Sequence, residues 1–166
     1  MKIEYRFATI NDVDQLVKLR TLMQLEVNNY KPEDVTAEFI EKVKTYFLNS
    51  IPTKKYYSSV AIYEEKIIGT AGVCFYEKPP SLSGGFGLNG YVTNVYVEKD
   101  FRQKGVGSQM MRELNQLAFE MKADKLHLGA TADGLSIYKA VGYQKPNFVN
   151  LEIKTPFKEK RSVNNE

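Results

Sequence analysis

Apolar and polar residues follow two regular spacings in the first fifty residues of the chain. They alternate over residues 2–8 (KIEYRFA), which predicts a half-buried strand. Apolar side chains then recur every three or four positions over residues 13–23 and again over residues 39–47, and each run follows residues that can cap a helix. The segment 28–32, with two asparagines and a proline, separates the two runs. The pattern therefore predicts one strand followed by two amphipathic helices.

The middle of the chain changes to runs that favour strands. Residues 56–63 and 67–76 are rich in β-branched and aromatic residues, and the short polar segment between them predicts a hairpin. Pro, Gly and Ser are frequent in residues 77–90, so we expect a loop there. Residues 91–97 (YVTNVYV) predict another strand, and helical spacing then runs over about residues 105–121.

The last part of the chain alternates short strands with a short helix. The sequence predicts a strand in KLHLGA (125–130), a helix over 135–141 and a further strand over 143–153, and we expect the polar tail 154–166 to be frayed. The element order is β-α-α-β-β-β-α-β-α-β. This order predicts a single α+β domain over residues 1–166, with a mixed, mostly antiparallel sheet and helices on both faces.

Composition and charge narrow the function classes. The chain has 166 residues, of which 43% are hydrophobic and 26% charged, as in an ordinary single globular domain. Its formal net charge of +3 does not indicate a nucleic-acid partner, although it mildly favours an anionic ligand. The lone Cys74 and the lone His127 exclude an internal disulfide and a structural zinc site, so we expect no metal. No signal peptide is visible and no apolar run approaches the ~20 residues that span a bilayer, which predicts a cytoplasmic protein without a membrane partner.

The strongest chemical signal lies directly after the predicted strand 91–97. There RQKGVG leads straight into a helix. The first N–H groups of a helix have no intrahelical partner and lie at the positive end of its dipole. Gly105 and Gly107 would let a phosphate approach these groups, and Arg102 and Lys104 would add positive charge. Taken alone, the motif also fits an ordinary strand-to-helix turn with two glycines.

Two motifs together resemble a known family. Residues 94–111 resemble the acetyl-CoA-binding signature of the GCN5-related N-acetyltransferase (GNAT) superfamily, in which R/Q-x-x-G-x-G/A follows a strand and opens a helix. LHLGATADGLSIYKAVGY (126–143) is similar to the closing motif of that family, a strand and a short helix with a Tyr and a final Gly-aromatic pair. The strand-helix-helix order of residues 1–50 also fits. The resemblance implies an acetyl-CoA-dependent N-acetyltransferase.

The resemblance also implies roles for individual positions. The backbone of Val95–Val97 should pair with the pantetheine arm of acetyl-CoA, and the amides from Gln103 to Ser108 should hold its diphosphate. Tyr138 lies at the position of the usual general acid, which protonates the CoA thiolate; its alternative role is core packing. Thr131 lies where many members have a cofactor-contacting Asn. The full set expected to contact the cofactor is Val95, Tyr96, Val97, Arg102, Gln103, Lys104, Gly105, Val106, Gly107, Ser108 and Thr131.

The acceptor side is less defined by the sequence. A direct attack of a primary amine on the thioester, with both reactants bound, is the expected reaction, and a small-molecule amine is the expected acceptor. Glu26, Tyr30 and Asn94 are candidates for contacting the acceptor. The sequence has Leu126 where some relatives have a Glu that acts as the general base. Deprotonation of the amine is therefore expected to run through water ordered by Glu26, Asn94 or a carbonyl group.

Several alternatives stay open at this stage. The acceptor could instead be a protein N-terminus or lysine side chain, and a chain of another class, a non-catalytic acyl-CoA sensor, would keep the cofactor site without the transfer. His127 could act as a base, but its alternation with two leucines favours a structural role, and Cys74 is expected to be an inert thiol. The predicted last strand and the tail could mediate a homodimer.

Overall fold

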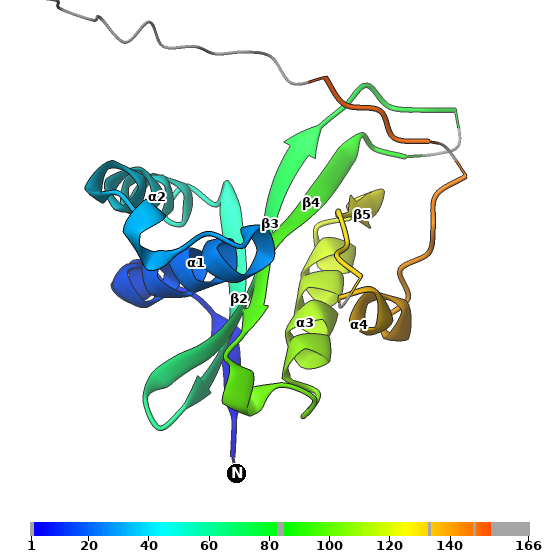
Figure 1. Ribbon diagram of the computed structural model, residues 1–166. Coiled ribbons are helices and arrows are strands. Elements are labelled where there is room, and N and C mark those ends of the chain that lie inside the picture. Colours follow the sequence, from blue (N-terminus) through cyan, green and yellow to red (C-terminus); the bar gives the residue numbers. More distant parts are fainter. Residues whose placement is uncertain (1, 83–84, 133, 148, 154–166) are drawn as a thin grey trace, which may run out of the picture.

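The computed structural model describes residues 2–82, 85–132, 134–147 and 149–153. In this part of the chain, five strands form one sheet in the order β1-β2-β3-β4-β5 (Figure 1). The first four strands pair antiparallel, and β5 is parallel to β4. The strands are β1 (Glu4–Phe7), β2 (Tyr56–Tyr63), β3 (Lys66–Glu77), β4 (Leu88–Val97) and β5 (Lys125–His127).

Helices cover both faces of this sheet. The helices are α1 (Val13–Asn28) and α2 (Ala37–Ser50) on one face, and α3 (Val106–Glu120) and α4 (Leu135–Ala140) on the other (Figure 1). Consecutive strand residues point to opposite faces: Val60 packs with the α1/α2 core, and Ala61 packs with the α3 core. The predicted mixed, mostly antiparallel sheet with helices on both faces is confirmed. Within the described ranges, no helix combines the length and the apolar character needed to cross a membrane.

The C-terminal strand predicted over residues 143–153 is wrong for the part of that range that the structure describes. Residues 143–147 and 149–153 form no strand, and β5 ends at His127, three residues before the predicted end. Val149, Leu151 and Ile153 are 85–91% exposed. Their alternation satisfies the strand pattern, but among the described residues they pair with no strand of the sheet, and their apolar side chains stay exposed. The predicted frayed tail lies outside the described residues.

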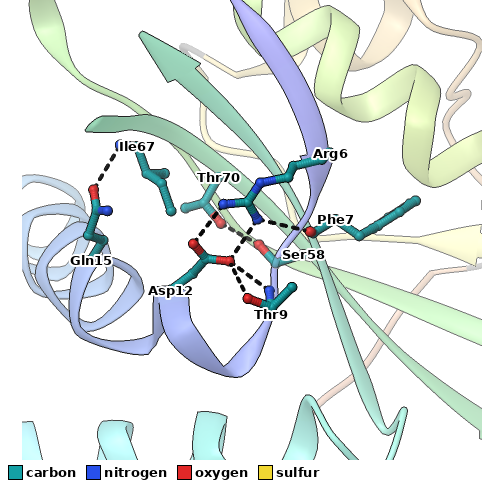
Figure 2. A network of polar contacts seen from close by, with 8 residues as sticks. All are labelled: Arg6, Phe7, Thr9, Asp12, Gln15, Ser58, Ile67 and Thr70. Carbon is teal, nitrogen blue, oxygen red and sulfur yellow. Dashed lines mark hydrogen bonds and ion pairs between the residues drawn. The ribbon is translucent and has the colours of Figure 1, made fainter. Parts of the chain in front are cut away.

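A buried carboxylate ties β1 to the start of α1 (Figure 2). Both oxygens of Asp12 accept hydrogen bonds from the Arg6 guanidinium, at 2.7 and 2.8 Å. The Thr9 amide and hydroxyl also donate to Asp12, at 2.7 and 3.1 Å. These bonds, the Arg6 pair foremost, lower the pKa of Asp12 to about 2 although burial acts against them. The strand-to-helix corner therefore depends on an ionised carboxyl group.

This corner predicts a loss of stability in acid. Because folding lowers the pKa of Asp12 from 3.8 to about 2, its contribution is present above about pH 4 and is lost as the pH falls toward 2. We expect Asp12→Asn to lower the free energy of unfolding by about 1–2 kcal/mol at pH 7, a figure reduced because Arg6 is half exposed. Urea unfolding at pH 7 and at pH 2.5 measures this. A variant as destabilised at pH 2.5 as at pH 7 would contradict the ionic contribution.

Candidate functional site

The sheet opens between β4 and β5. These strands pair only at Asn89↔Lys125, Gly90↔Leu126 and Tyr91↔His127, yet β4 continues to Val97. Beyond Tyr91, the edge of β4 that faces away from β3 has no strand partner in the ranges that the structure describes. Val95–Val97 lie on this open edge. An unpaired strand edge can bind an extended ligand chain through backbone hydrogen bonds.

A bulge in β4 lies at the middle of this opening. The β3–β4 register shifts between Thr70 and Gly72, and Asn94 adopts the left-handed φ of 55°. The Asn94 side chain is buried, and its Nδ2 donates to the Tyr56 hydroxyl at 3.2 Å. The Tyr56 ring fits here because it lies against Gly72, where a Cβ atom would collide with it. Asn94 Oδ1 is buried and, among the described residues, has no donor. This oxygen is therefore an acceptor that the described residues leave unsatisfied.

A turn with unpaired backbone amides connects β4 to α3. Gln103 and Gly105 have φ angles of 59° and 77°, which turn successive amides in the same direction. The backbone N–H groups from Gln103 to Ser108 donate no hydrogen bond within the described ranges, whereas Gln109 N donates to Gly105 O at 3.0 Å. The space in front of Gly105 is open, since a Cβ atom there would have no neighbour within 4 Å. Unpaired amides at a helix N-terminus with open space before them suit a phosphate group.

Arg102 is held by partners that the sequence did not indicate. Its Nε donates to Val97 O at 2.8 Å, and its two terminal nitrogens donate to both carboxylate oxygens of Glu26 at 2.6 and 2.9 Å. Its guanidinium also lies 5.4 Å from the centre of the Tyr96 ring. The Glu26 bond lowers the pKa of Glu26, which keeps the pair ionised. The pair thus links the end of β4 to α1, and Glu26 already has a cationic partner within the protein.

Two tyrosines from the closing motif differ in how they are held. The Tyr143 hydroxyl donates to Asn115 Oδ1 at 3.1 Å, and the Asn115 amide donates to Val141 O. The Tyr138 hydroxyl has no hydrogen-bond partner among the described residues, while its ring packs 6.1 Å from that of Tyr143 on the α3 side of the sheet. Burial raises the pKa of Tyr138 above its ordinary value, so this hydroxyl stays protonated. Tyr138 therefore presents a free proton donor.

The remaining residues singled out by the sequence lie around these features. Thr131 Oγ1 accepts a hydrogen bond from Gly134 N in the turn before α4. Lys104 Nζ donates to Asp100 O, and Tyr30 is 56% exposed just after α1. The Cys74 Sγ atom lies 3.2 Å from the Tyr46 hydroxyl, in agreement with a packed thiol.

The sequence did not indicate that aromatic residues gather on the α1/α2 side of the opening. Tyr56 and Tyr76 were assigned only to strands or to the cleft in general, and His127 was interpreted as structural. The alternation of side chains along each strand could have placed Tyr76 and His127 on one face of the sheet. Their hydrogen bond joins residues 51 apart in the chain, however, so it could be predicted only from the order of the strands in the sheet.

Comparison with known proteins decides the family. The sequence model of the acetyltransferase (GNAT) family matches residues 19–143, which is most of the chain. The chain belongs to the GNAT acetyltransferase family. The matched range contains the opening between β4 and β5, the turn before α3 and both closing-motif tyrosines.

Solved structures agree with this assignment. A predicted acetyltransferase from Clostridium acetobutylicum, solved with acetyl-CoA, is 28% identical with a TM-score of 0.78, covering 91% of this chain and 96% of that one. A GCN5-related N-acetyltransferase from Ralstonia eutropha JMP134 is 22% identical with a TM-score of 0.77, covering 92% and 99%. An aminoglycoside acetyltransferase from an uncultured soil metagenomic sample, in complex with sisomicin, is 18% identical with a TM-score of 0.71, covering 92% and 96%. No curated protein matches the sequence.

This GNAT protein is therefore an acetyl-CoA-dependent acetyltransferase. Its residues fit the cofactor on two structural grounds. The turn before α3 offers unpaired amides and open space where a diphosphate would bind, and the free edge of β4 can pair with an extended arm.

Proposed function

We propose that this acetyltransferase moves the acetyl group of acetyl-CoA to the primary amine of a small molecule, by direct attack while both reactants are bound. The observation that carries the proposal is the run of unpaired amides from Gln103 to Ser108, directly after a strand edge that is also unpaired. Together these groups can hold the two ends of one long, anionic, extended ligand. Holding both reactants in attack geometry then supplies much of the acceleration.

Residues on β4 and α4 would carry the chemical step. The backbone of Val95–Val97 would orient the pantetheine arm so that the thioester lies near the bulge at Asn94. A backbone N–H on this edge would stabilise the negative charge that develops on the thioester oxygen. As the amine nitrogen bonds to the carbonyl carbon and the C–S bond breaks, the Tyr138 hydroxyl would give its proton to the departing thiolate.

The charge pairing of Glu26 and the unsatisfied oxygen of Asn94 bear on how an acceptor would be bound. Glu26, a candidate for contacting the acceptor, is paired with Arg102, so its charge is already balanced. Asn94 Oδ1 is buried and has no donor among the described residues, and in this proposal it would accept a hydrogen bond from the attacking amine. A small-molecule acceptor is also what the metagenomic relative holds, since that structure contains sisomicin. The free hydroxyl of Tyr138 favours a catalyst over a sensor that only binds acyl-CoA.

A panel of amines tests the proposal directly. We expect free thiol to be released from acetyl-CoA with at least one of sisomicin, glucosamine 6-phosphate, spermidine or an amino acid, and mass spectrometry should show the acetylated product. Peptides with a free N-terminus or an internal lysine belong in the same panel. Faster transfer to a peptide would replace the small-molecule acceptor with a protein, and CoA binding without any transfer would favour the sensor.

A further inference from the structure

Three aromatic side chains meet where β4 and β5 part. The Tyr76 hydroxyl lies 2.6 Å from Nε2 of His127. The imidazole lies between two tyrosine rings, with centres 5.8 Å from that of Tyr76 and 5.1 Å from that of Tyr91. Tyr91 and His127 form the last residue pair between the two strands, so the cluster borders the opening.

The cluster lies on the side of the sheet opposite to Tyr138. Leu126 packs with the α3 core, and strand alternation turns the next residue, His127, to the α1/α2 side. Tyr91 is paired with Cys74, which contacts Tyr46 of α2, and this confirms the side. Tyr138 packs with the α3 core instead. A hydrogen-bonded imidazole and a free phenol therefore lie on opposite sides of the opening in which the thioester would bind.

We propose that His127 is the general base that takes a proton from the acceptor ammonium, and that Tyr76 is the positioning residue that holds it. In this arrangement Nε2–H donates to the Tyr76 oxygen and the lone pair of Nδ1 is free. Nδ1 has no hydrogen-bond partner in the ranges that the structure describes. The inference rests on the proposed function, because it concerns the amine of that reaction.

The proton balance of the step is complete. The acceptor enters as an ammonium ion, and one N–H proton passes through bridging water to Nδ1. Water is needed because His127 lies beside Tyr91, whereas the thioester would lie near Asn94. The three-residue step along β4 from Tyr91 to Asn94 spans about 10 Å, which is too far for direct proton transfer. The neutral nitrogen forms the C–N bond, the C–S bond breaks, and Tyr138 protonates the thiolate. The second N–H proton, lost as the amide forms, restores the Tyr138 phenol through solvent, and His127 releases its proton to solvent.

The surroundings of His127 keep it neutral and ready to accept. Burial, followed by the charges of Lys125 and Lys78, lowers the pKa of His127 below its ordinary value of 6.5. The groups that face it are Tyr76 from β3, Tyr91 from β4, Lys125 on its own strand and Lys78, whose amine lies 5.7 Å from the Tyr76 ring centre. Its base form therefore predominates at neutral pH, as a general base requires.

Nitrogen NMR tests the tautomer without any acceptor. The chain has one histidine, so the full chain with ¹⁵N-labelled histidine and no purification tag gives a single imidazole spectrum. We expect the proton on Nε2 at pH 7.5 and a titration midpoint below pH 6.5. In Tyr76→Phe, the proton should redistribute toward Nδ1. A wild-type spectrum with the proton mainly on Nδ1 would overturn the proposal, since that nitrogen could then accept nothing.

The pH dependence of kcat/KM, with the best amine of the panel, tests the reaction. We expect wild-type kcat/KM to be level above the His127 pKa up to about pH 9, because the enzyme binds the ammonium form and removes its proton. In His127→Gln the side-chain amide can still bond to Tyr76, but the amine must arrive neutral. Its kcat/KM should fall by about 10²-fold at pH 7 and rise about tenfold per pH unit.

The controls separate this inference from the proposed function and from folding. Tyr5→Phe removes a hydroxyl from β1, the opposite edge of the sheet, and should leave the profile unchanged. Affinity for acetyl-CoA should be equal in all variants. An active His127→Gln enzyme with the wild-type rate and profile overturns the base alone. A wild type that acetylates no amine overturns the proposed function, and this inference with it. If His127→Gln fails to fold, Tyr76→Phe must show a lower rate and an altered pH profile, or the proposal fails.

Discussion

Tyr138→Phe is expected to lower kcat by roughly 10²-fold and leave the affinity for acetyl-CoA unchanged, if Tyr138 protonates the departing thiolate. The substitution keeps the ring and its packing against Tyr143, and it removes a hydroxyl that bonds to nothing else in the described structure. The loss should appear equally in kcat and kcat/KM, because the proton is transferred only in the transition state. Steady-state kinetics with the best acceptor, together with calorimetric titration of acetyl-CoA, measures both quantities.

Tyr143→Phe is the matched control for this experiment. It removes a hydroxyl from the neighbouring ring, but that hydroxyl donates to Asn115 Oδ1 and serves the fold. We expect a loss of about 1 kcal/mol in unfolding free energy and little change in kcat. Equal kcat in Tyr138→Phe and the wild type would make Tyr138 a packing residue, and water would then have to protonate the thiolate.

Gly105→Asn is expected to weaken CoA binding by about two orders of magnitude, because its side chain would occupy the open space before the unpaired amides. Asparagine tolerates the left-handed φ of 77° better than other residues, so the backbone should keep its path. Each charge-assisted hydrogen bond to phosphate contributes about 1.5–3 kcal/mol, and losing one or two explains the expected change. Titration calorimetry with CoA gives the Kd.

Gly142→Asn provides the comparison. Gly142 has a φ of 100° and, like Gly105, open space where its Cβ atom would be, but it ends α4 and does not precede α3. The two variants should lose similar amounts of stability, while only Gly105→Asn loses affinity for CoA. Similar Kd values for both variants would show that the diphosphate binds elsewhere.

Much of this architecture could be predicted from sequence because local patterns determine it. The apolar stripe of α3 and the glycines before it are neighbours in the chain, so both the helix and the glycine-containing turn before it could be expected. The prediction of a strand over residues 143–153 failed because alternation shows that a segment could be half buried and cannot show whether the segment pairs with a strand of the sheet.

Contacts between distant residues explain what the sequence could not indicate. Arg102 and Glu26 were expected to serve a cofactor and an acceptor, respectively, but they bind each other across 76 residues. The pairing of Tyr76 with His127 depends on β3, β4 and β5 being adjacent. Each of these side chains satisfies its local pattern equally well with or without its partner, so only the folded arrangement distinguishes the two cases.

The unpartnered oxygen of Asn94 has a consequence for how this enzyme could be evolved. A buried oxygen without a donor costs a free protein about 1–3 kcal/mol, which a bound amine would recover. Glycine accepts the φ of 55° at this position, and phenylalanine at position 56 would remove the hydroxyl that Asn94 satisfies. A library screened for heat resistance should therefore enrich Asn94→Gly together with Tyr56→Phe. A library screened for turnover should retain the asparagine, so heat resistance and turnover select in opposite directions at this one position.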